Sequence, residues 1–140
     1  AFYAHTKRAE VALTEVWADL LADAGISFHS MHPGWADTPG VSRSLPRFHR
    51  LMRPLLRDPR EGADTIVWLA TSHEAGSGRG EFWHDRRRRP KHRLPWTRES
   101  REERDRLWAH CARIGGLAAE PDEAAILRTL ADRNSIKRRL

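Results

Sequence analysis

A tyrosine and a lysine near the start of the chain have the residue types and the spacing needed for proton transfer. Tyr3 and Lys7 are four residues apart, about one helical turn, so their side chains project from one helical face. A free phenol, with a pKa of about 10, transfers protons poorly at neutral pH, and a neighbouring ammonium lowers that pKa. The pair is a candidate acid/base group, and a tyrosine and a lysine on a solvated helix face remain the alternative.

Lysine is rare in this chain, which makes Lys7 notable. Tyr3 is the only tyrosine, and the 25 basic residues are almost all arginine, with lysine only at positions 7, 91 and 137. Arginine would replace Lys7 poorly, because its planar guanidinium differs from an ammonium in size and donor geometry.

Two elements must position the candidate residues. Apolar residues at alternating three- and four-residue steps over residues 3–24 predict an amphipathic helix with Tyr3 and Lys7 at the edge of its apolar stripe, ended by Gly25. Residues 26–32 alternate as in a short strand and lead into a loop over residues 33–40. Ligands bind at the carboxyl ends of strands in open α/β sheets, so this loop is a candidate ligand site, with an ordinary turn as the alternative.

The next segment, residues 42–57, combines an apolar stripe with arginines, and Pro54 should break or kink a helix there. Three interpretations stay open: a lid over an apolar substrate, a surface that packs on a partner subunit, and a segment near anionic lipid. Asp58, Pro59 and Glu61 then predict a capped helix start. The residues expected to be buried in this helix are Ala63, Ile66, Val67 and Ala70, with Trp68 and Leu69 widening the stripe.

The second part of the chain is strongly basic. Residues 1–84 carry 9 Lys and Arg against 10 Asp and Glu, whereas residues 85–140 carry 16 against 9. The run over residues 86–93 is predicted to be a solvated or disordered linker, because no aromatic stacking platform or recognised module supports nucleic-acid binding. Ser100 and Glu103 predict a capped helix that ends at Gly115 and Gly116, and a short helix is expected over residues 121–130.

The bulk properties narrow the function classes further. The length of 140 residues suits one domain with a modest core. Cys111 is the only cysteine, which suits a reducing cytosol, so we expect a cytoplasmic protein. No apolar run reaches membrane-spanning length. None of the eight histidines pairs at a metal-ligand spacing, so we expect no metal. The chain lacks an initiating Met and opens inside a predicted helix, as a fragment would.

In order, these elements resemble the second half of the Rossmann domain of the short-chain dehydrogenase/reductase family. They are Tyr-x-x-x-Lys on a long helix, a strand, His-Pro-Gly-x-x-x-Thr, a variable segment, a capped helix, a glycine-containing loop and a strand. The resemblance covers about residues 3–85, and the two motifs together are more specific than either alone. It implies an α/β fold: a partial Rossmann-like, doubly wound parallel half-domain over residues 1–85. A basic linker and helical extension would follow over residues 86–140.

The resemblance also implies residue roles. Tyr3 would be the general acid/base on the substrate oxygen, and Lys7 would lower its pKa and bind the nicotinamide ribose. Residues 33–35 would line the nicotinamide, and Thr38 would hold its carboxamide or a nearby phosphate. The implied cofactor-binding residues are therefore Tyr3, Lys7, Pro33, Gly34, Trp35 and Thr38. The cofactor would be NAD or NADP and the substrate an alcohol or ketone, with a lipophilic one suggested by residues 34–40; the sequence does not choose between the two cofactors.

The chain departs from the family pattern at its start. Only Ala1 and Phe2 precede Tyr3, so the nucleotide-binding half, including the glycine-rich loop and the catalytic serine, is absent from these 140 residues. We therefore expect the chain alone to be marginally folded and inactive. The alternative function is a non-catalytic binding or oligomerisation module that docks, as homo- or hetero-oligomer, through the helices over residues 3–24 and 59–72. A nucleic-acid-binding module would rest on the basic tail alone, and we expect no specific nucleic-acid partner.

Overall fold

The computed structural model describes residues 2–117, except for the side chains of residues 76 and 77, and it has five α-helices and three strands in that part of the chain. In chain order the elements are α1 (Phe2–Leu20), β1 (Ser30–Met31), α2 (Pro39–Ser44), α3 (Pro46–Met52), η1 (Arg53–Leu55), α4 (Pro59–Thr71), η2 (His73–Ser77), β2 (Phe82–His84), β3 (Arg87–Arg89), η3 (Pro95–Thr97) and α5 (Arg101–Gly115).

The strands form one small mixed sheet in the order β1-β2-β3. β1 runs parallel to β2, with Ser30 opposite Phe82, and β2 runs antiparallel to β3, with Trp83 opposite Arg88. Hydrogen bonds extend the parallel pairing at both ends, from Ser30 N–H to Glu81 O and from the backbone N–H of residue 32 to Trp83 O. The predicted α/β class is confirmed, but the described sheet contains one parallel and one antiparallel pair.

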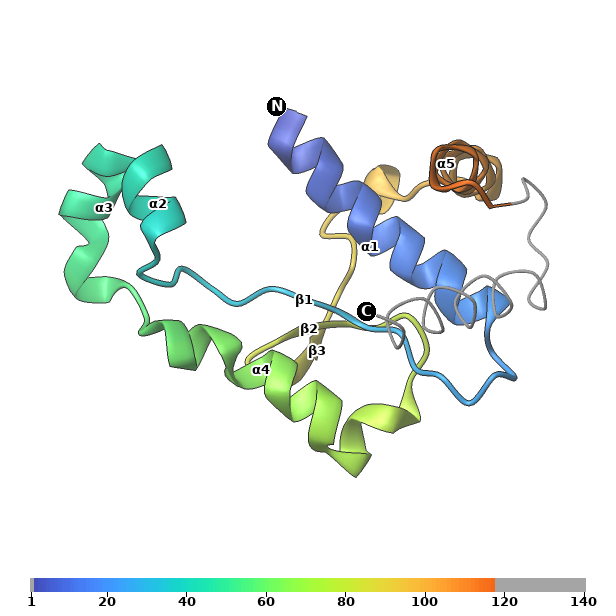
Figure 1. Cartoon of the computed structure of the whole chain (residues 1–140), viewed down its shortest axis with the longest axis horizontal. Helices are drawn as coiled ribbons and strands as arrows, with labels where there is room; N and C mark the ends of the chain where they lie inside the picture. Colours follow the sequence, from blue (N-terminus) through green and yellow to red (C-terminus); the bar gives the residue numbers. More distant parts are fainter. Residues whose placement is uncertain (1, 118–140) are drawn as a thin grey trace, which may run out of the picture.

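Helices α1 and α4 lie on opposite sides of this sheet (Figure 1). On the α4 side, the rings of Trp68 and Trp83 are 5.2 Å apart. On the α1 side, Gly80 has a φ of +62° and lies against the helix, because an added Cβ would come within 3.2 Å of the Glu15 Cα. Only a glycine fits both this conformation and this approach.

The apolar core lies between the carboxyl-terminal half of α1 and α5. Leu21, Trp108 and Ala112 are buried there, and partly buried apolar residues of α1, among them Leu13 and Val16, and of the segments after each helix surround them. The amino-terminal turns of α1 are outside this cluster. Apolar burial therefore fixes one end of the longest helix and leaves its other end to different contacts.

Two boundaries differ from the prediction. The first helix ends at Leu20, and a turn follows in which Gly25 takes the expected left-handed conformation with a φ of +68°. The predicted strand over residues 26–32 is reduced to β1, Ser30–Met31. Backbone pairing begins at Phe28, whose carbonyl oxygen accepts from the Gly80 N–H at 3.1 Å, and becomes a regular strand only at Ser30; Ile26 precedes this pairing and is exposed.

The predicted burial of α4 is wrong. Its buried residues are Gly62 and Thr65, whereas Ile66 and Val67 are 56% and 57% exposed. Ala63 and Ala70 are exposed as well, and only Trp68 and Leu69 of the predicted stripe are partly buried. A small residue is needed on the sheet side of this helix, because a Cβ at position 62 would lie 3.1 Å from the Ala36 Cβ. The most apolar face of α4 therefore points away from the sheet. The capping box between Asp58 and Glu61 is confirmed.

The predicted linker over residues 86–93 is solvated, but it contains a strand that the sequence did not predict. Arg87–Arg89 form β3, and a turn with positive φ at Asp85 and Arg86 joins it to β2. Two consecutive residues with positive φ are what a tight hairpin turn requires. The Arg86 N–H donates to Thr65 Oγ1 at 3.3 Å, and the Arg86 side chain is paired with Asp64. Backbone pairing and these contacts thus hold a run whose composition alone is typical of a solvated segment.

The expected helix after Ser100 is confirmed as α5, with a capping box between Ser100 and Glu103 and a left-handed Gly116 at its end. The expected helix over residues 121–130 lies outside the described residues. Residues 42–57 contain the end of α2, all of α3, which begins at Pro46, and η1, which contains Pro54. In Figure 1 α2 and α3 stand to the left of the sheet. No contact decides between the three interpretations of this segment, which stay predictions.

Within the described helices, none combines the length and apolarity needed to cross a membrane. Within the same residues, no group of three or more His, Cys, Asp or Glu side chains is close enough to hold a metal ion.

Candidate functional site

The first two turns of α1 carry Tyr3 and Lys7 on one face. The Lys7 Nζ lies 5.9 Å from the centroid of the Tyr3 ring, within the range of a cation–π contact. Tyr3 is 74% exposed, so its hydroxyl is accessible. The spacing predicted from the sequence is therefore realised, while the catalytic roles stay predictions.

Glu10 holds the lysine of this pair. The Lys7 Nζ donates to both carboxylate oxygens of Glu10 at 2.9 Å. This hydrogen bond raises the pKa of the Lys7 amine, so the ammonium remains charged at neutral pH. Glu10 is one helical turn after Lys7, an i,i+3 arrangement that the sequence would have allowed us to predict.

The loop after β1 has a fixed conformation at Gly34. This residue has a φ of +77°, and its N–H donates to His32 Nδ1 at 2.9 Å. A Cβ at Gly34 would lie 3.0 Å from a guanidinium nitrogen of Arg57. Glycine is therefore required both by the backbone conformation and by the arginine stacked against it.

His32 accepts that hydrogen bond as a neutral ring. Partial burial lowers the pKa of His32, and the nearby charges of His84 and Arg57 lower it further. The rings of His32 and His84 are 5.7 Å apart, edge to face. A neutral imidazole at pH 7 keeps Nδ1 available as the acceptor for Gly34.

Arg57 is the residue of this region that sequence reasoning missed, since it was counted only among the arginines of residues 42–57. Its Nη2 donates to Asp85 Oδ2 at 2.9 Å, and its Nη1 donates to Pro33 O at 3.5 Å. The ion pair lowers the pKa of the Asp85 carboxyl. Backbone bonds from Arg57 N–H to Trp35 O and from the N–H of residue 37 to Arg57 O tie the same loop. Arg57 thus joins the loop to the β2–β3 turn.

Trp35 and Thr38 have local structural partners. The Trp35 ring packs on Phe48 of α3 at a centroid distance of 4.6 Å. Thr38 is the N-cap of α2, and its Oγ1 accepts from the Val41 N–H at 3.4 Å. The Thr38 hydroxyl can still donate its own proton, because a hydroxyl has one donor and two acceptor positions.

The two parts of the predicted site lie toward the same end of the sheet. α1 runs back along β1, so its first turns lie toward the side where β1 ends (Figure 1). Within residues 2–117, no hydrogen bond, ion pair or ring contact joins Tyr3 or Lys7 to residues 33–38. The helix and the loop therefore present two separate sets of groups toward one edge, and nothing in the described chain bridges them.

Comparison with known proteins gives relatives of one kind. The chain is 48% identical over 99 residues to dehydrogenase/reductase SDR family member 12 of Bos taurus, covering 70% of this chain and 30% of that protein. It is 32% identical over 130 residues to dehydrogenase/reductase SDR family member 13 of Homo sapiens, covering 86% and 34%. It is 30% identical over 90 residues to retinol dehydrogenase 11 of Mus musculus, covering 59% and 27%.

The chain thus spans about a third or less of the length of these curated relatives. No family model matches it, and no solved structure matches it. The matches to the relatives nevertheless extend over 59–86% of the chain. The chain belongs to the short-chain dehydrogenase/reductase family.

Proposed function

We propose that this chain provides the acid/base and nicotinamide-facing part of an NAD(P)-dependent oxidoreductase that acts on an alcohol or a ketone. The observation that carries the proposal is the Lys7 ammonium beside the Tyr3 ring, on an accessible helical face. It occurs in a chain whose relatives are named dehydrogenases and reductases.

Tyr3 would move the proton of the reaction. In the reductive direction its hydroxyl gives a proton to the carbonyl oxygen of the substrate, and in the oxidative direction the phenolate removes the proton of the alcohol. Lys7 supplies the positive charge that favours the phenolate, and Glu10 keeps that charge in place. The bound nicotinamide would supply or accept the hydride.

The donor set of this edge fits a nicotinamide ribose and carboxamide. Lys7 directs Nζ at both oxygens of Glu10 and retains donor capacity, since an ammonium has three N–H groups. Residues 33–35 are held by Arg57, and Thr38 can donate its hydroxyl proton while it accepts from Val41. We assign cofactor contacts to Tyr3, Lys7, residues 33–35 and Thr38 on this basis.

The apolar surroundings of the loop suit a lipophilic substrate. Trp35 is exposed beside Phe48, and the nearby α3–η1 segment exposes Leu51 and Leu55. One relative is named a retinol dehydrogenase. A substrate with a hydrocarbon part would cover these side chains on binding, which is favourable in water.

The 140 residues alone should give no turnover. The chain spans only 30–34% of the length of its relatives, so much of an enzyme of this size would have to come from residues outside these 140. The contacts to the adenosine half of the cofactor would therefore have to be supplied by other residues, and affinity for the intact cofactor should be low.

Fluorescence titration of the chain with NADH and with NADPH tests the proposal. We expect weak saturable binding that falls about tenfold in Lys7→Ala, since that variant loses a charged hydrogen bond to the cofactor. Arg93→Ala is the matched control, because it also removes one exposed positive charge and should leave binding unchanged. Binding that does not saturate, or that falls equally in both variants, would overturn the cofactor assignment.

A second candidate function is a docking module without catalysis. The observation in its favour is the exposed apolar face of α4, with Ile66 and Val67 more than half exposed. Sedimentation equilibrium tests it: self-association that is lost in Ile66→Asp and retained in Leu51→Asp would favour this function. A monomer at all concentrations would argue against docking between copies of this chain.

A further inference from the structure

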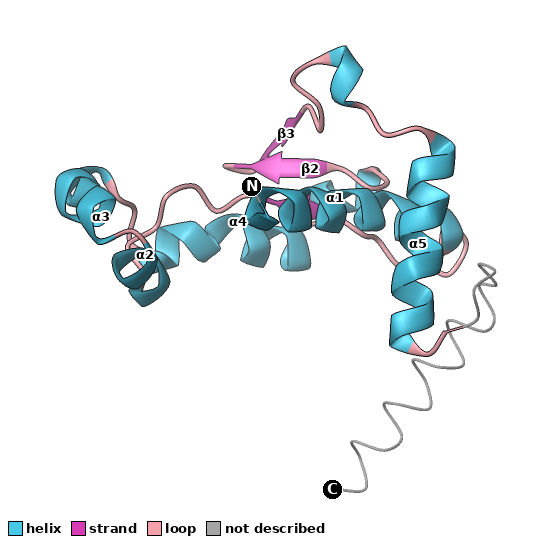
Figure 2. Cartoon of the chain, turned by 90° about the horizontal axis from the view of Figure 1, so that it is seen from above, coloured by secondary structure: helices cyan, strands magenta, loops and turns pink. Residues whose placement is uncertain are grey.

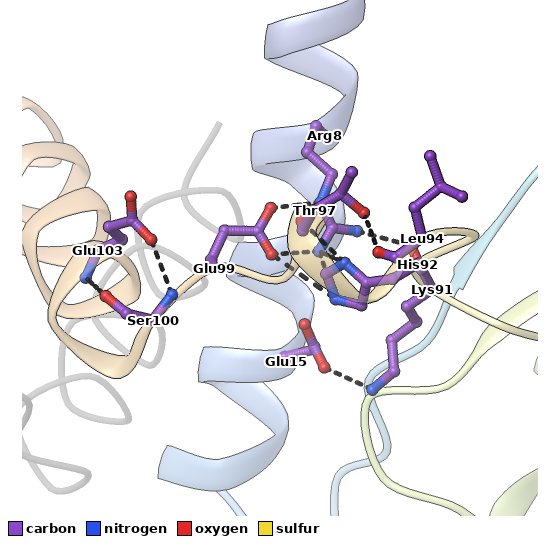
Figure 3. A network of polar contacts seen from close by, with 9 residues as sticks. All are labelled: Arg8, Glu15, Lys91, His92, Leu94, Thr97, Glu99, Ser100 and Glu103. Atoms are coloured by element: carbon purple, nitrogen blue, oxygen red, sulfur yellow. Dashed lines mark hydrogen bonds and ion pairs between the residues drawn. The ribbon is translucent and has the colours of Figure 1, made fainter.

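Helix α1 is attached at two points along its length to one connecting segment, residues 91–99, which lies between β3 and α5 (Figure 3). The attachment residues on the helix are Arg8 and Glu15. They are seven residues apart, about two helical turns, so both lie on one stripe of α1 and about 10 Å apart along its axis.

Arg8 makes the larger set of contacts. Its Nε and Nη2 each bond one carboxylate oxygen of Glu99, its Nη1 donates to Lys91 O at 3.1 Å, and its Nη2 lies 2.9 Å from His92 Nε2. A guanidinium that binds a carboxylate through two parallel bonds is fixed in orientation as well as in position. The ion pair lowers the pKa of the Glu99 carboxyl.

The His92 imidazole forms hydrogen bonds on both sides, to Arg8 and to the backbone of Thr97. Its Nδ1 lies 3.0 Å from Thr97 O, which can only accept, so the proton is on Nδ1. His92 Nε2 then carries the lone pair and accepts from Arg8. The imidazole therefore connects the helix to the turn of residues 94–97, where Thr97 Oγ1 also donates to Leu94 O at 2.7 Å.

The second attachment joins Glu15 to Lys91, whose Nζ donates to Glu15 Oε1 at 2.5 Å. The side chains of Arg8 and Glu99 are 29% and 24% exposed, and those of Lys91 and Glu15 are 25% and 15% exposed. Within residues 2–117, the other ion pairs between an Arg or Lys and a carboxylate are more exposed. Screening by water is therefore weakest at these two contacts.

The connecting segment is itself held at both ends. It follows β3, which is paired with β2, and Glu99 directly precedes Ser100, the N-cap of α5. α5 in turn packs on the other half of α1 through Trp108 and Leu21. In Figure 2 the turn of residues 95–97 lies between the hairpin and α5. Because the segment is fixed to the sheet and to α5, its contact with Arg8 fixes the first turns of α1 relative to both.

From this geometry we propose that Arg8, His92 and Glu99 are positioning residues for the Tyr3–Lys7 pair. Arg8 follows Lys7 directly and lies about 100° round the helix from it. Fixing the guanidinium therefore fixes the rotation of the turn that carries Tyr3 and Lys7. The contribution to catalysis rests on the function proposed above, whereas the mechanical role does not.

The need for such contacts follows from the exposure of this end. Phe2, Tyr3 and Lys7 are exposed and outside the apolar core, and the first turns of a helix fray when only local bonds hold them. Residues from the part of the chain beyond the predicted Rossmann segment would thus order the part that carries the chemistry.

Amide hydrogen exchange on the full 140-residue chain tests the mechanical role. We expect the amides of residues 6–10 to exchange at least about tenfold faster in Arg8→Lys and in Glu99→Gln than in the unmodified chain. Arg86→Lys is the matched control, because Arg86 makes the same two-bond contact with Asp64 but does not touch α1. Exchange in α5 should be unchanged in all three variants and reports that the fold is retained.

A titration of the phenol absorbance tests the effect on the site, since Tyr3 is the only tyrosine. Lys7→Ala gives the midpoint without an ammonium one turn away. In Arg8→Lys and in Glu99→Gln, the midpoint of the phenol titration should lie between the midpoints of the unmodified chain and of Lys7→Ala. In Arg86→Lys it should equal the midpoint of the unmodified chain. If either single variant is too unstable to measure, the double variant Arg8→Glu with Glu99→Arg should restore slow exchange only in part, because the ion pair is re-formed but a carboxylate at position 8 cannot donate to Lys91 O or to His92 Nε2.

Unchanged exchange at residues 6–10 in both single variants, or equal acceleration in Arg86→Lys, would overturn the positioning role. Equal midpoints for the unmodified chain and Lys7→Ala would instead count against the acid/base pair and so against the proposed function. The exchange measurement would then still decide whether the connecting segment orders the helix.

Discussion

The two ends of α1 are held by different kinds of interaction. At the carboxyl end, Leu21 is 1% exposed and packs with Trp108 and Ala112 of α5. At the amino end, the apolar side chain of Phe2 is exposed, and Arg8 attaches the helix to the connecting segment, to which Glu15 is bound about two turns further along.

The difference matters because the two interactions constrain different things. Apolar burial is non-directional and roughly proportional to the area removed from water, so it supplies stability with little demand on angle. A two-bond guanidinium–carboxylate pair contributes less free energy but fixes an orientation. Stability is therefore concentrated at one end of the helix and orientation at the other, which is the end that carries Tyr3 and Lys7.

The largest expected effect is at the apolar end. Leu21→Ala should lower the free energy of unfolding by about 2–5 kcal/mol, because it leaves a cavity in the core. Urea denaturation followed by tryptophan fluorescence measures this loss. Leu51→Ala, at an exposed position, should change it by less than about 0.5 kcal/mol. A comparable loss in both variants would show that the core does not lie where we describe it.

Removing the main contact of the other end should cost less. Arg8→Ala should lower the free energy of unfolding by about 1–3 kcal/mol, because it leaves the partly buried Glu99 carboxylate unpaired. Arg86→Ala removes a more exposed ion pair and should cost less than Arg8→Ala does. The same urea denaturation distinguishes them. A smaller loss for Arg8→Ala than for Arg86→Ala would contradict the greater screening that we infer for the latter.

The amino-terminal contacts should also weaken in acid. Arg8 lowers the pKa of Glu99 in the folded chain, so the ion pair contributes fully above the unfolded pKa of this carboxyl and is lost as pH falls through the folded value. The stability difference between the unmodified chain and Glu99→Gln, about 1–2 kcal/mol at pH 7, should therefore shrink as pH falls below about 4.5. Urea denaturation at a series of pH values measures it, with Asp105→Asn as control. A difference that grows in acid would have the wrong sign.

The smallest effect on stability is expected at the candidate site itself. Lys7→Ala removes an exposed ion pair with Glu10 and should not change the urea midpoint measurably. The same variant should nevertheless lower cofactor affinity, as described above. Loss of affinity together with loss of stability would mean that Lys7 holds the helix rather than the cofactor.

Features that depend on neighbouring residues could be predicted from the sequence. The capping boxes at Asp58 and Ser100, the left-handed Gly25 and Gly116, and the shared face of Tyr3 and Lys7 all follow from spacings of a few residues. Each is decided by local backbone geometry, which the sequence encodes directly.

Features that depend on distant residues could not. Arg8 and Glu99 are 91 positions apart, and Arg57 reaches Asp85 across 28. The buried face of α4 was misjudged because apolar periodicity identifies an apolar face but not what covers it. The strand β3 was missed because a run of arginines is polar by composition, whereas its pairing with β2 depends on the turn at residues 85–86.

The position of β3 has a further consequence for how the sheet could be extended. β3 lies at one edge, and its three residues, Arg87–Arg89, are all exposed. A row of positive charges on an edge strand disfavours pairing with a like-charged edge of another molecule, which protects against aggregation. The opposite edge belongs to β1, whose residues carry no charge. The two edges therefore differ toward an added strand. A basic strand is repelled by the arginines of β3, whereas no charge on β1 opposes its pairing there.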